Sequence, residues 1–172
     1  MSDMSDNKFL TVMAVFDDKT QKLLGGIRQS IIEKAGEGTQ TMGIPFHITL
    51  GSYPVSDADE LVDKIARVCE VVHAFPIRLK GFGSFGDAVL YLAPDVTSSL
   101  LALRREFECD YANGFEWVPH ATVFCGSEEQ VRTARNSLPA LDFPIDAHVV
   151  AIELGEFFPP RKMARENLKT RR

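Results

Sequence analysis

Two short stretches of the sequence repeat the same pair of polar residues. Thr49 lies two positions after His47, and Thr122 lies two positions after His120, with an apolar residue between and another following. Because alternate residues of a β-strand point to the same side, each histidine should share a face of its strand with its threonine. An imidazole can take or give a proton near neutral pH, and a hydroxyl can donate a hydrogen bond. The pattern predicts acid–base chemistry on a phosphate held between two parts of the protein, with these four residues as the catalytic set.

Such a set suits the opening of a cyclic phosphate ester. Water must lose a proton as it attacks phosphorus, and the leaving sugar oxygen must gain one. Two histidines on opposite sides of phosphorus permit an in-line displacement, while the hydroxyls of Thr49 and Thr122 can bind the non-bridging oxygens. The sequence leaves open which histidine is the base and which is the acid.

Each histidine lies in a segment with the same predicted order of elements. The triplet Phe-Pro-Ile recurs at 75–77 and 143–145, in the same place after each histidine. Runs of β-branched and aromatic residues predict strands, and apolar residues at helical spacing predict helices. The predicted strands lie over 9–16, 46–50 and 75–80 and over 89–92, 118–124 and 143–154; the predicted helices lie over 17–34, from 56, after 95 and over 127–138. The order indicates an internal duplication.

We expect an α+β fold built from two duplicated β-α-β-α-β units. Each unit should form a small antiparallel-type sheet with its helices outside, so that the two sheets face a central cleft. The predicted first lobe spans 8–86 and the second spans 87–160, within one compact domain. Residues 161–172 carry six basic side chains and one acidic side chain, and we expect them to form a disordered tail.

Charge and composition limit the partners. The net charge is −5, and because the last twelve residues contribute +5, the rest of the chain carries −10. Such a body repels a long polyanion, so we expect a small nucleotide or an RNA end as the substrate. The three cysteines have no metal-type spacing, and no apolar run approaches the ~20 residues of a membrane span. We expect a cytoplasmic monomer that uses no membrane, metal or other cofactor.

Six further residues are candidates for substrate binding. Two basic residues after the first Phe-Pro-Ile could supply charge for a phosphate, and a histidine takes the corresponding place in the second repeat. Aromatic rings can stack on a base, although packed rings are commoner. The candidates are Arg78, Lys80, His148, Tyr53, Phe85 and Trp117.

The two His-x-Thr-x motifs, one in each α+β repeat, resemble those of the 2H phosphoesterase superfamily, which includes the 2′-5′ RNA ligase-like and cyclic phosphodiesterase families. The resemblance covers about residues 8–158. It implies a bilobal fold and chemistry on 2′,3′-cyclic phosphates or 2′-5′ phosphodiesters, without a metal. Many members that act on RNA ends are expected to carry a basic residue soon after the second motif, where this chain has Cys125 and Gly126. That departure concerns the substrate more than the class of reaction.

Three other functions fit parts of the same pattern. Ligation at 2′-5′ linkages is the reverse of a diesterase step, so the sequence does not separate the two directions. A nucleotide or RNA-end binding module without turnover would keep the same residues. A zinc hydrolase would use His47, His120 and a third ligand such as His148 or an acidic residue, although zinc has no use for the threonine beside each histidine.

Overall fold

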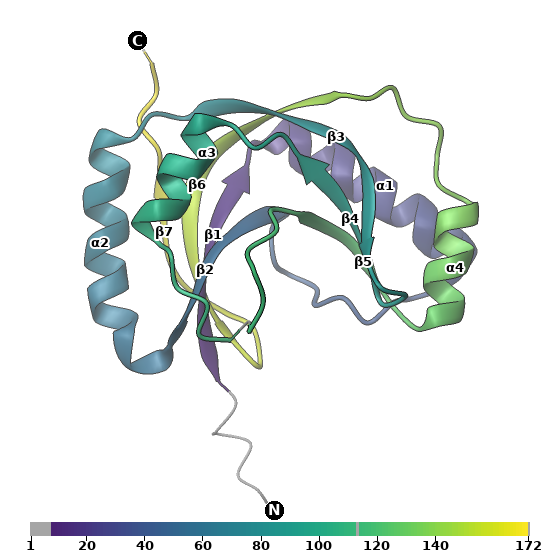
Figure 1. The fold of residues 1–172 in the computed structure, drawn as a ribbon, viewed down its shortest axis with the longest axis horizontal. Coiled ribbons are helices and arrows are strands. Elements are labelled where there is room, and N and C mark those ends of the chain that lie inside the picture. Colours follow the sequence, from purple (N-terminus) through teal and green to yellow (C-terminus); the bar gives the residue numbers. More distant parts are fainter. Residues whose placement is uncertain (1–7, 113, 172) are drawn as a thin grey trace, which may run out of the picture.

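Seven strands form one antiparallel sheet in the computed structural model, which describes residues 8–112 and 114–171 (Figure 1). The predicted α+β class is confirmed, and the order of the elements follows the predicted repeat. The first repeat comprises β1 (Phe9–Phe16), α1 (Asp18–Ala35), β2 (His47–Pro54), α2 (Ala58–Val71) and β3 (Phe75–Phe85). The second comprises β4 (Val89–Pro94), α3 (Ser98–Glu106), β5 (Ala121–Cys125), α4 (Glu128–Asn136) and β6 (Ile145–Phe157), and β7 (Arg161–Asn167) follows.

The expectation of two separate sheets is wrong, because β3 and β6 pair and join the halves. Their register runs from Phe75 opposite Val149 to Leu79 opposite Ile145. The strand order is β2-β1-β6-β3-β4-β5, with β7 beside β6. The third strand of each repeat thus pairs with the first strand of the other repeat, so hydrogen bonding crosses the predicted boundary between residues 86 and 87. The order reads as a palindrome of the two repeats, with a pseudo-twofold axis between β3 and β6.

The sheet is distorted at nearly every strand pair. Each pairing except that of β3 with β6 contains a register irregularity, as between Val12 and Met13 on β1 or Leu90 and Tyr91 on β4. Bulges of this kind bend a strand and increase the local twist. As a result β2 and β5, which end the strand order on its two sides, contact each other in the middle of the molecule (Figure 1).

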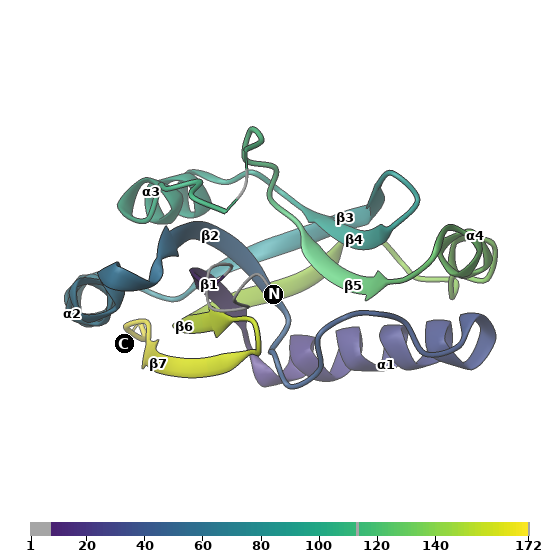
Figure 2. The same ribbon diagram turned by 90° about the horizontal axis from the view of Figure 1, so that it is seen from below.

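Helices cover the sheet in two pairs. Helices α1 and α4 pack beside each other over one half, and α2 and α3 lie over the other (Figures 1 and 2). Side-chain caps begin three of the helices: Asp17 accepts from the Thr20 N–H, Thr97 from the Leu100 N–H and Ser127 from the Gln130 N–H. Such caps satisfy amide groups that the first helical turn leaves unpaired.

The predicted alternation along the two motifs is present. On β2, Ile48 and Leu50 are fully buried, whereas His47 and Thr49 are partly exposed. Around β5, the apolar neighbours of Thr122 are fully buried in the same way. The strand begins at residue 121 rather than 118, so His120 lies immediately before it.

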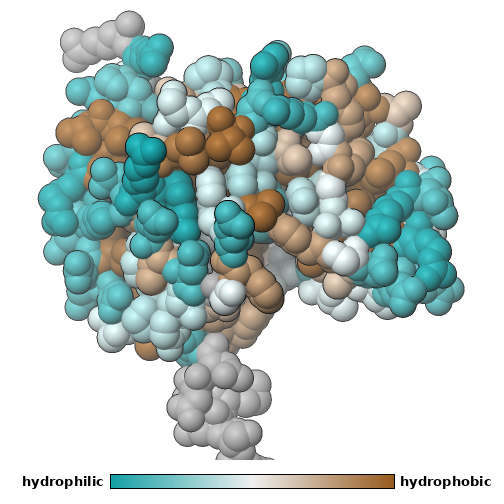
Figure 3. Space-filling model, viewed as in Figure 1, coloured by the Kyte–Doolittle hydropathy of each residue, from teal (hydrophilic) through white to brown (hydrophobic). Residues whose placement is uncertain are grey.

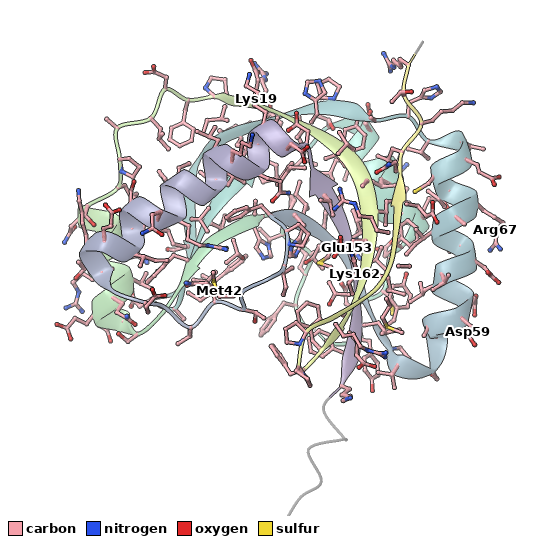
Figure 4. The ribbon with its side chains drawn as sticks, turned by 180° about the vertical axis from the view of Figure 1, so that it is seen from behind. Lys19, Met42, Asp59, Arg67, Glu153 and Lys162 are labelled. Carbon is pink, nitrogen blue, oxygen red and sulfur yellow. The ribbon has the colours of Figure 1, made fainter. Side chains whose placement is uncertain are left out.

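The expectation of a disordered tail at 161–172 is wrong for most of that segment. β7 pairs with β6, and Leu168 after it is only 3% exposed. The basic charge, which suggested solvation, is matched on β6: Arg165 lies 3.3 Å from the carboxylate of Glu153, and Arg161 lies 3.5 Å from that of Glu156. Figure 4 shows β7 beside β6 at the labelled Glu153 and Lys162. Within the described residues, no helix is both long and apolar enough to cross a membrane.

The packing of the tail yields a stability prediction. Leu168→Ala should lower the free energy of unfolding by about 2 kcal/mol or more, because it removes buried methyl groups and leaves a cavity. Urea unfolding measures this, with Thr170→Ala as the matched control at an exposed position, where the change should stay within about 0.5 kcal/mol. Equal stability of the two variants would mean that the tail does not pack as described.

Candidate active site

The two motif histidines are held by the same hydrogen bond. Nδ1 of His47 lies 2.7 Å from the carbonyl oxygen of Pro45, and Nδ1 of His120 lies 2.7 Å from that of Val118. A carbonyl can only accept, so each Nδ1 carries the proton and donates it. In both neutral rings Nε2 is therefore left with a free lone pair, the form in which imidazole can accept a proton from a substrate.

Burial keeps both imidazoles neutral. Loss of hydration lowers the pKa of His47 to about 4; the Pro45 carbonyl acts in the opposite direction, and the nearby positive charges of His120 and Arg28 lower the pKa further. Burial also lowers the pKa of His120, against the effect of the Val118 carbonyl. Contacts between β2 and β5, and the hydrogen bond from Trp117 to the Thr49 carbonyl, bring the two rings into one site, although 73 positions separate them in the sequence.

The threonines accompany the histidines on the two contacting strands. Thr49 lies opposite Met13 of β1, and Thr122 lies opposite Tyr91 of β4. Both side chains are partly exposed, as a ligand-binding hydroxyl requires. The structure thus places all four predicted catalytic residues where β2 and β5 meet. The space-filling view shows this side of the molecule hollowed between its two halves (Figure 3).

Aromatic rings flank the second histidine. The centroid of the Phe85 ring lies 4.7 Å from that of His120, edge to face, and Tyr91 lies 5.5 Å from the same imidazole. Gly83 leaves room for the Tyr91 ring, because a Cβ at residue 83 would lie 2.5 Å from it. Phe85 was a candidate for base stacking and is beside the site, 38% exposed. Tyr91 was missed, although its place on the strand next to the second motif could have suggested it.

Two further aromatic candidates have different surroundings. Trp117 donates from Nε1 to the carbonyl oxygen of Thr49, 2.9 Å away, so it ties the segment before His120 to β2. Tyr53 packs against the core, and burial raises its pKa to about 12. It lies six residues beyond His47 on β2, about 20 Å along the strand, and is not brought to the histidines.

The three remaining candidates lie on β3 and β6, away from the catalytic set. Arg78 and Lys80 both pair with Asp95, at 3.2 and 2.6 Å, so a carboxylate offsets their charge. Arg78, Asp95 and His148 border a cavity of about 390 Å³ at the β3–β6 pairing, and neither motif histidine lines it. The structure does not join these candidates to the catalytic set.

Two arginines that no sequence pattern indicated also contact the motif strands, Arg28 on α1 and Arg104 on α3. Their spacing from the histidines carries no recognisable pattern, and the contacts arise only from the folded arrangement. Among the described residues, no group of three or more His, Cys, Asp or Glu side chains is arranged to hold a metal ion.

Comparison with known families and structures gives a consistent result. The family model described as the 2′-5′ RNA ligase superfamily matches residues 16–157. No curated protein sequence matches the chain at a significant level.

Several solved structures share the fold across nearly the whole chain. A crystal structure of TT0787 from Thermus thermophilus superposes with a TM-score of 0.64 at 13% identity, over 95% of this chain and 100% of that one. E. coli LigT complexed with 3′-AMP gives a TM-score of 0.61 at 15% identity, over 94% and 98% of the respective chains. A crystal structure described as a phosphoesterase gives 0.60 at 15% identity, over 94% and 99%. At these identities the likeness concerns the fold alone.

The hydrogen bonds of the histidines predict their titration. Long-range ¹H–¹⁵N spectra should show both rings as the Nδ1–H tautomer at neutral pH. As the pH falls, His120 should gain its proton below the ordinary value of 6.5, and His47 should stay neutral until about pH 4. His47→Gln and His120→Gln assign the signals. A His47 ring that is half protonated at pH 6.5 or above would contradict the described burial.

Proposed function

The chain belongs to the 2′-5′ RNA ligase superfamily, the 2H phosphoesterases, and on that premise we propose that it hydrolyses 2′,3′-cyclic phosphates or 2′-5′ phosphodiester bonds in RNA ends or small nucleotides. Membership confirms the resemblance predicted from the sequence. The observation that carries the proposal is the identical Nδ1–H bond of His47 and His120, which leaves two equivalent Nε2 atoms in one site.

The surroundings of the two rings support different roles. The positive charges near His47 disfavour its protonated form, so this ring is the base. Burial lowers the pKa of His120 without the added effect of a neighbouring positive charge, so this ring gains a proton more readily than His47 and is the acid. The proposal therefore assigns the first proton transfer to His47 and the second to His120.

The reaction then follows an in-line course. Nε2 of His47 takes a proton from water as the water oxygen forms a bond to phosphorus. The bond from phosphorus to one ribose oxygen breaks, and Nε2 of His120, which takes up a proton when the anionic phosphate binds beside it, gives that proton to the ribose oxygen. The hydroxyls of Thr49 and Thr122 donate to the non-bridging oxygens and stabilise the charge that develops there. The product is a ribose monophosphate, and a proton shift between solvent and the two rings restores the starting state.

A nucleotide ligand is consistent with the relatives and with the aromatic residues at the site. LigT, which shares the fold, has been crystallised with 3′-AMP, a nucleotide that carries its phosphate on the ribose. In this chain Phe85 is the ring we propose for stacking on a base, because it lies against His120 and remains 38% exposed. Ligation through the reverse step would use the same four residues.

Substitutions test the assignment directly. His47→Ala and His120→Ala should each lower kcat for a 2′,3′-cyclic nucleotide by about 10²–10⁴-fold, since each removes a general acid or base. Thr49→Val and Thr122→Val should lower kcat by a smaller factor, about 10- to 100-fold, because one phosphate contact is lost. Steady-state assays with 2′,3′-cyclic nucleotides and 2′-5′ dinucleotides measure both effects.

The matched control is His73→Ala, since His73 is an exposed histidine between α2 and β3. This variant should retain the wild-type rate. Hydrolysis that survives both His47→Ala and His120→Ala would refute the assignment, and tight nucleotide binding without any turnover by the wild type would favour a binding module instead.

A further inference from the structure

One arginine from the first repeat binds the motif strand of the second repeat. Arg28, on α1, donates from Nε to the carbonyl oxygen of Val123 at 2.8 Å and from Nη2 to that of Thr122 at 3.3 Å. These are the third and second residues after His120. The guanidinium thus fixes the main chain of the strand that carries the second threonine.

An arginine of the second repeat makes the equivalent contact with the motif strand of the first repeat. Arg104, on α3, donates to the carbonyl oxygen of Leu50, which is the third residue after His47. Arg104 is buried, at 5% exposure, and its Nη2 lies 3.0 and 3.1 Å from the two carboxylate oxygens of Asp110. Each repeat therefore sends one helix arginine to the same position of the other repeat's motif strand.

Both guanidinium groups also lie against an aromatic ring next to a motif. The Cζ atom of Arg28 is 4.2 Å from the ring centroid of Phe46, the residue before His47. The Cζ atom of Arg104 is 5.2 Å from the ring of Trp117, which itself donates to the Thr49 carbonyl. Arg28 therefore contacts residues at both motifs. Arg104 does so too, through Leu50 of the first motif and Trp117 before the second.

Edge strands explain why these contacts matter. β2 and β5 end the strand order, so within the described residues no further strand binds the carbonyl groups on their outer edges. A guanidinium is planar, stays charged and holds its donors in a fixed fork, so it can bind a carbonyl and stack on a ring at once. A contact of this kind fixes distance and angle more tightly than packing alone.

We propose that Arg28 and Arg104 form a pseudo-symmetric cross-brace of positioning residues, which sets the separation of His47 and His120 across the bound phosphate. Neither arginine needs to touch the substrate. The rate effect of the brace rests on the proposed function, whereas its effect on the two imidazoles does not.

The charges around His47 allow a structural role to be separated from a positioning role. The charged and titratable groups that act on His47 are His120, before β5, and Arg28, on α1; Cys125 of β5 lies beside Arg28. Loss of the Arg28 charge should therefore raise the pKa of His47, while a lysine in its place should preserve the charge and lose the fork.

The test compares Arg28→Met, Arg28→Lys and Arg67→Met in the full chain. Arg28 is chosen because it is partly exposed, whereas removal of Arg104 would leave Asp110 without its partner. Arg67 is an exposed arginine on the outer side of α2, which makes it the matched control (Figure 4). The readouts are kcat and KM for a 2′,3′-cyclic nucleotide, the NMR titration of both histidines, and thermal unfolding.

For Arg28→Met we expect kcat to fall by about 10- to 100-fold, the usual result of misplacing a catalytic group, with KM changed by less than about threefold. The His47 titration should move to higher pH. Arg28→Lys should restore the titration but not kcat, and Arg67→Met should match the wild type. If Arg28→Met fails to fold, Arg28→Lys carries the test through the same kcat loss in a folded protein.

Two results would overturn the brace. One is a kcat within about twofold of the wild type in folded Arg28→Met or Arg28→Lys; the other is an unchanged pair of histidine signals in both variants. If the wild type turns over no substrate, the proposed function fails, but the brace is still decided by Arg28→Lys, which keeps the charge. Signals of the neutral His47 and His120 rings that move in Arg28→Lys and not in Arg67→Met support the brace, and signals that stay at their wild-type positions in Arg28→Lys refute it.

Discussion

Contact between the two edge strands is the constraint on which the candidate site depends. β2 and β5 are the farthest apart in the strand order, yet each carries one motif. A flat sheet of this order would hold the motifs five strands apart, roughly 24 Å at 4.8 Å per strand. The register irregularities twist and bend the sheet until its two edges meet, and the exchange of β3 and β6 between the repeats holds the halves together in that shape.

The polar side chains where β2 and β5 meet lose hydration when they are buried, and nearby hydrogen-bond partners offset that loss. Both imidazoles are desolvated and kept neutral, with their Nδ1 protons bound by carbonyls. The buried guanidinium of Arg104 is satisfied by Asp110 and the Leu50 carbonyl, and no buried side-chain nitrogen or oxygen within the described ranges lacks a partner. Unpaired buried polar groups cost about 1–3 kcal/mol each, so such pairing allows a polar site inside a small fold. The same pairing leaves Nε2 of both rings free for chemistry.

Local sequence patterns predicted the features that are set by residues close together in the chain. Alternation placed Ile48 and Leu50 in the core, and the recurrent Phe-Pro-Ile triplet identified the duplication. Such patterns did not predict that β3 and β6 pair and join the two halves into one sheet, because this pairing is between segments far apart in the sequence. The basic residues of the tail suggested disorder, because the sequence does not show that Glu153 and Glu156 of β6 pair with them. The role of Arg28 could not be predicted for a similar reason. Its partners are main-chain carbonyl groups about 95 positions away, and no side-chain pattern marks them.

A crystal structure with a bound nucleoside 2′-phosphate would locate the phosphate relative to both rings and so decide whether the two histidines act on one phosphorus atom. We expect Nε2 of His47 and Nε2 of His120 within about 3.2 Å of oxygens of one phosphate group, on opposite sides of phosphorus. A phosphate that contacts only one of these rings, or that occupies the depression beside Arg78 and His148 instead, would contradict it.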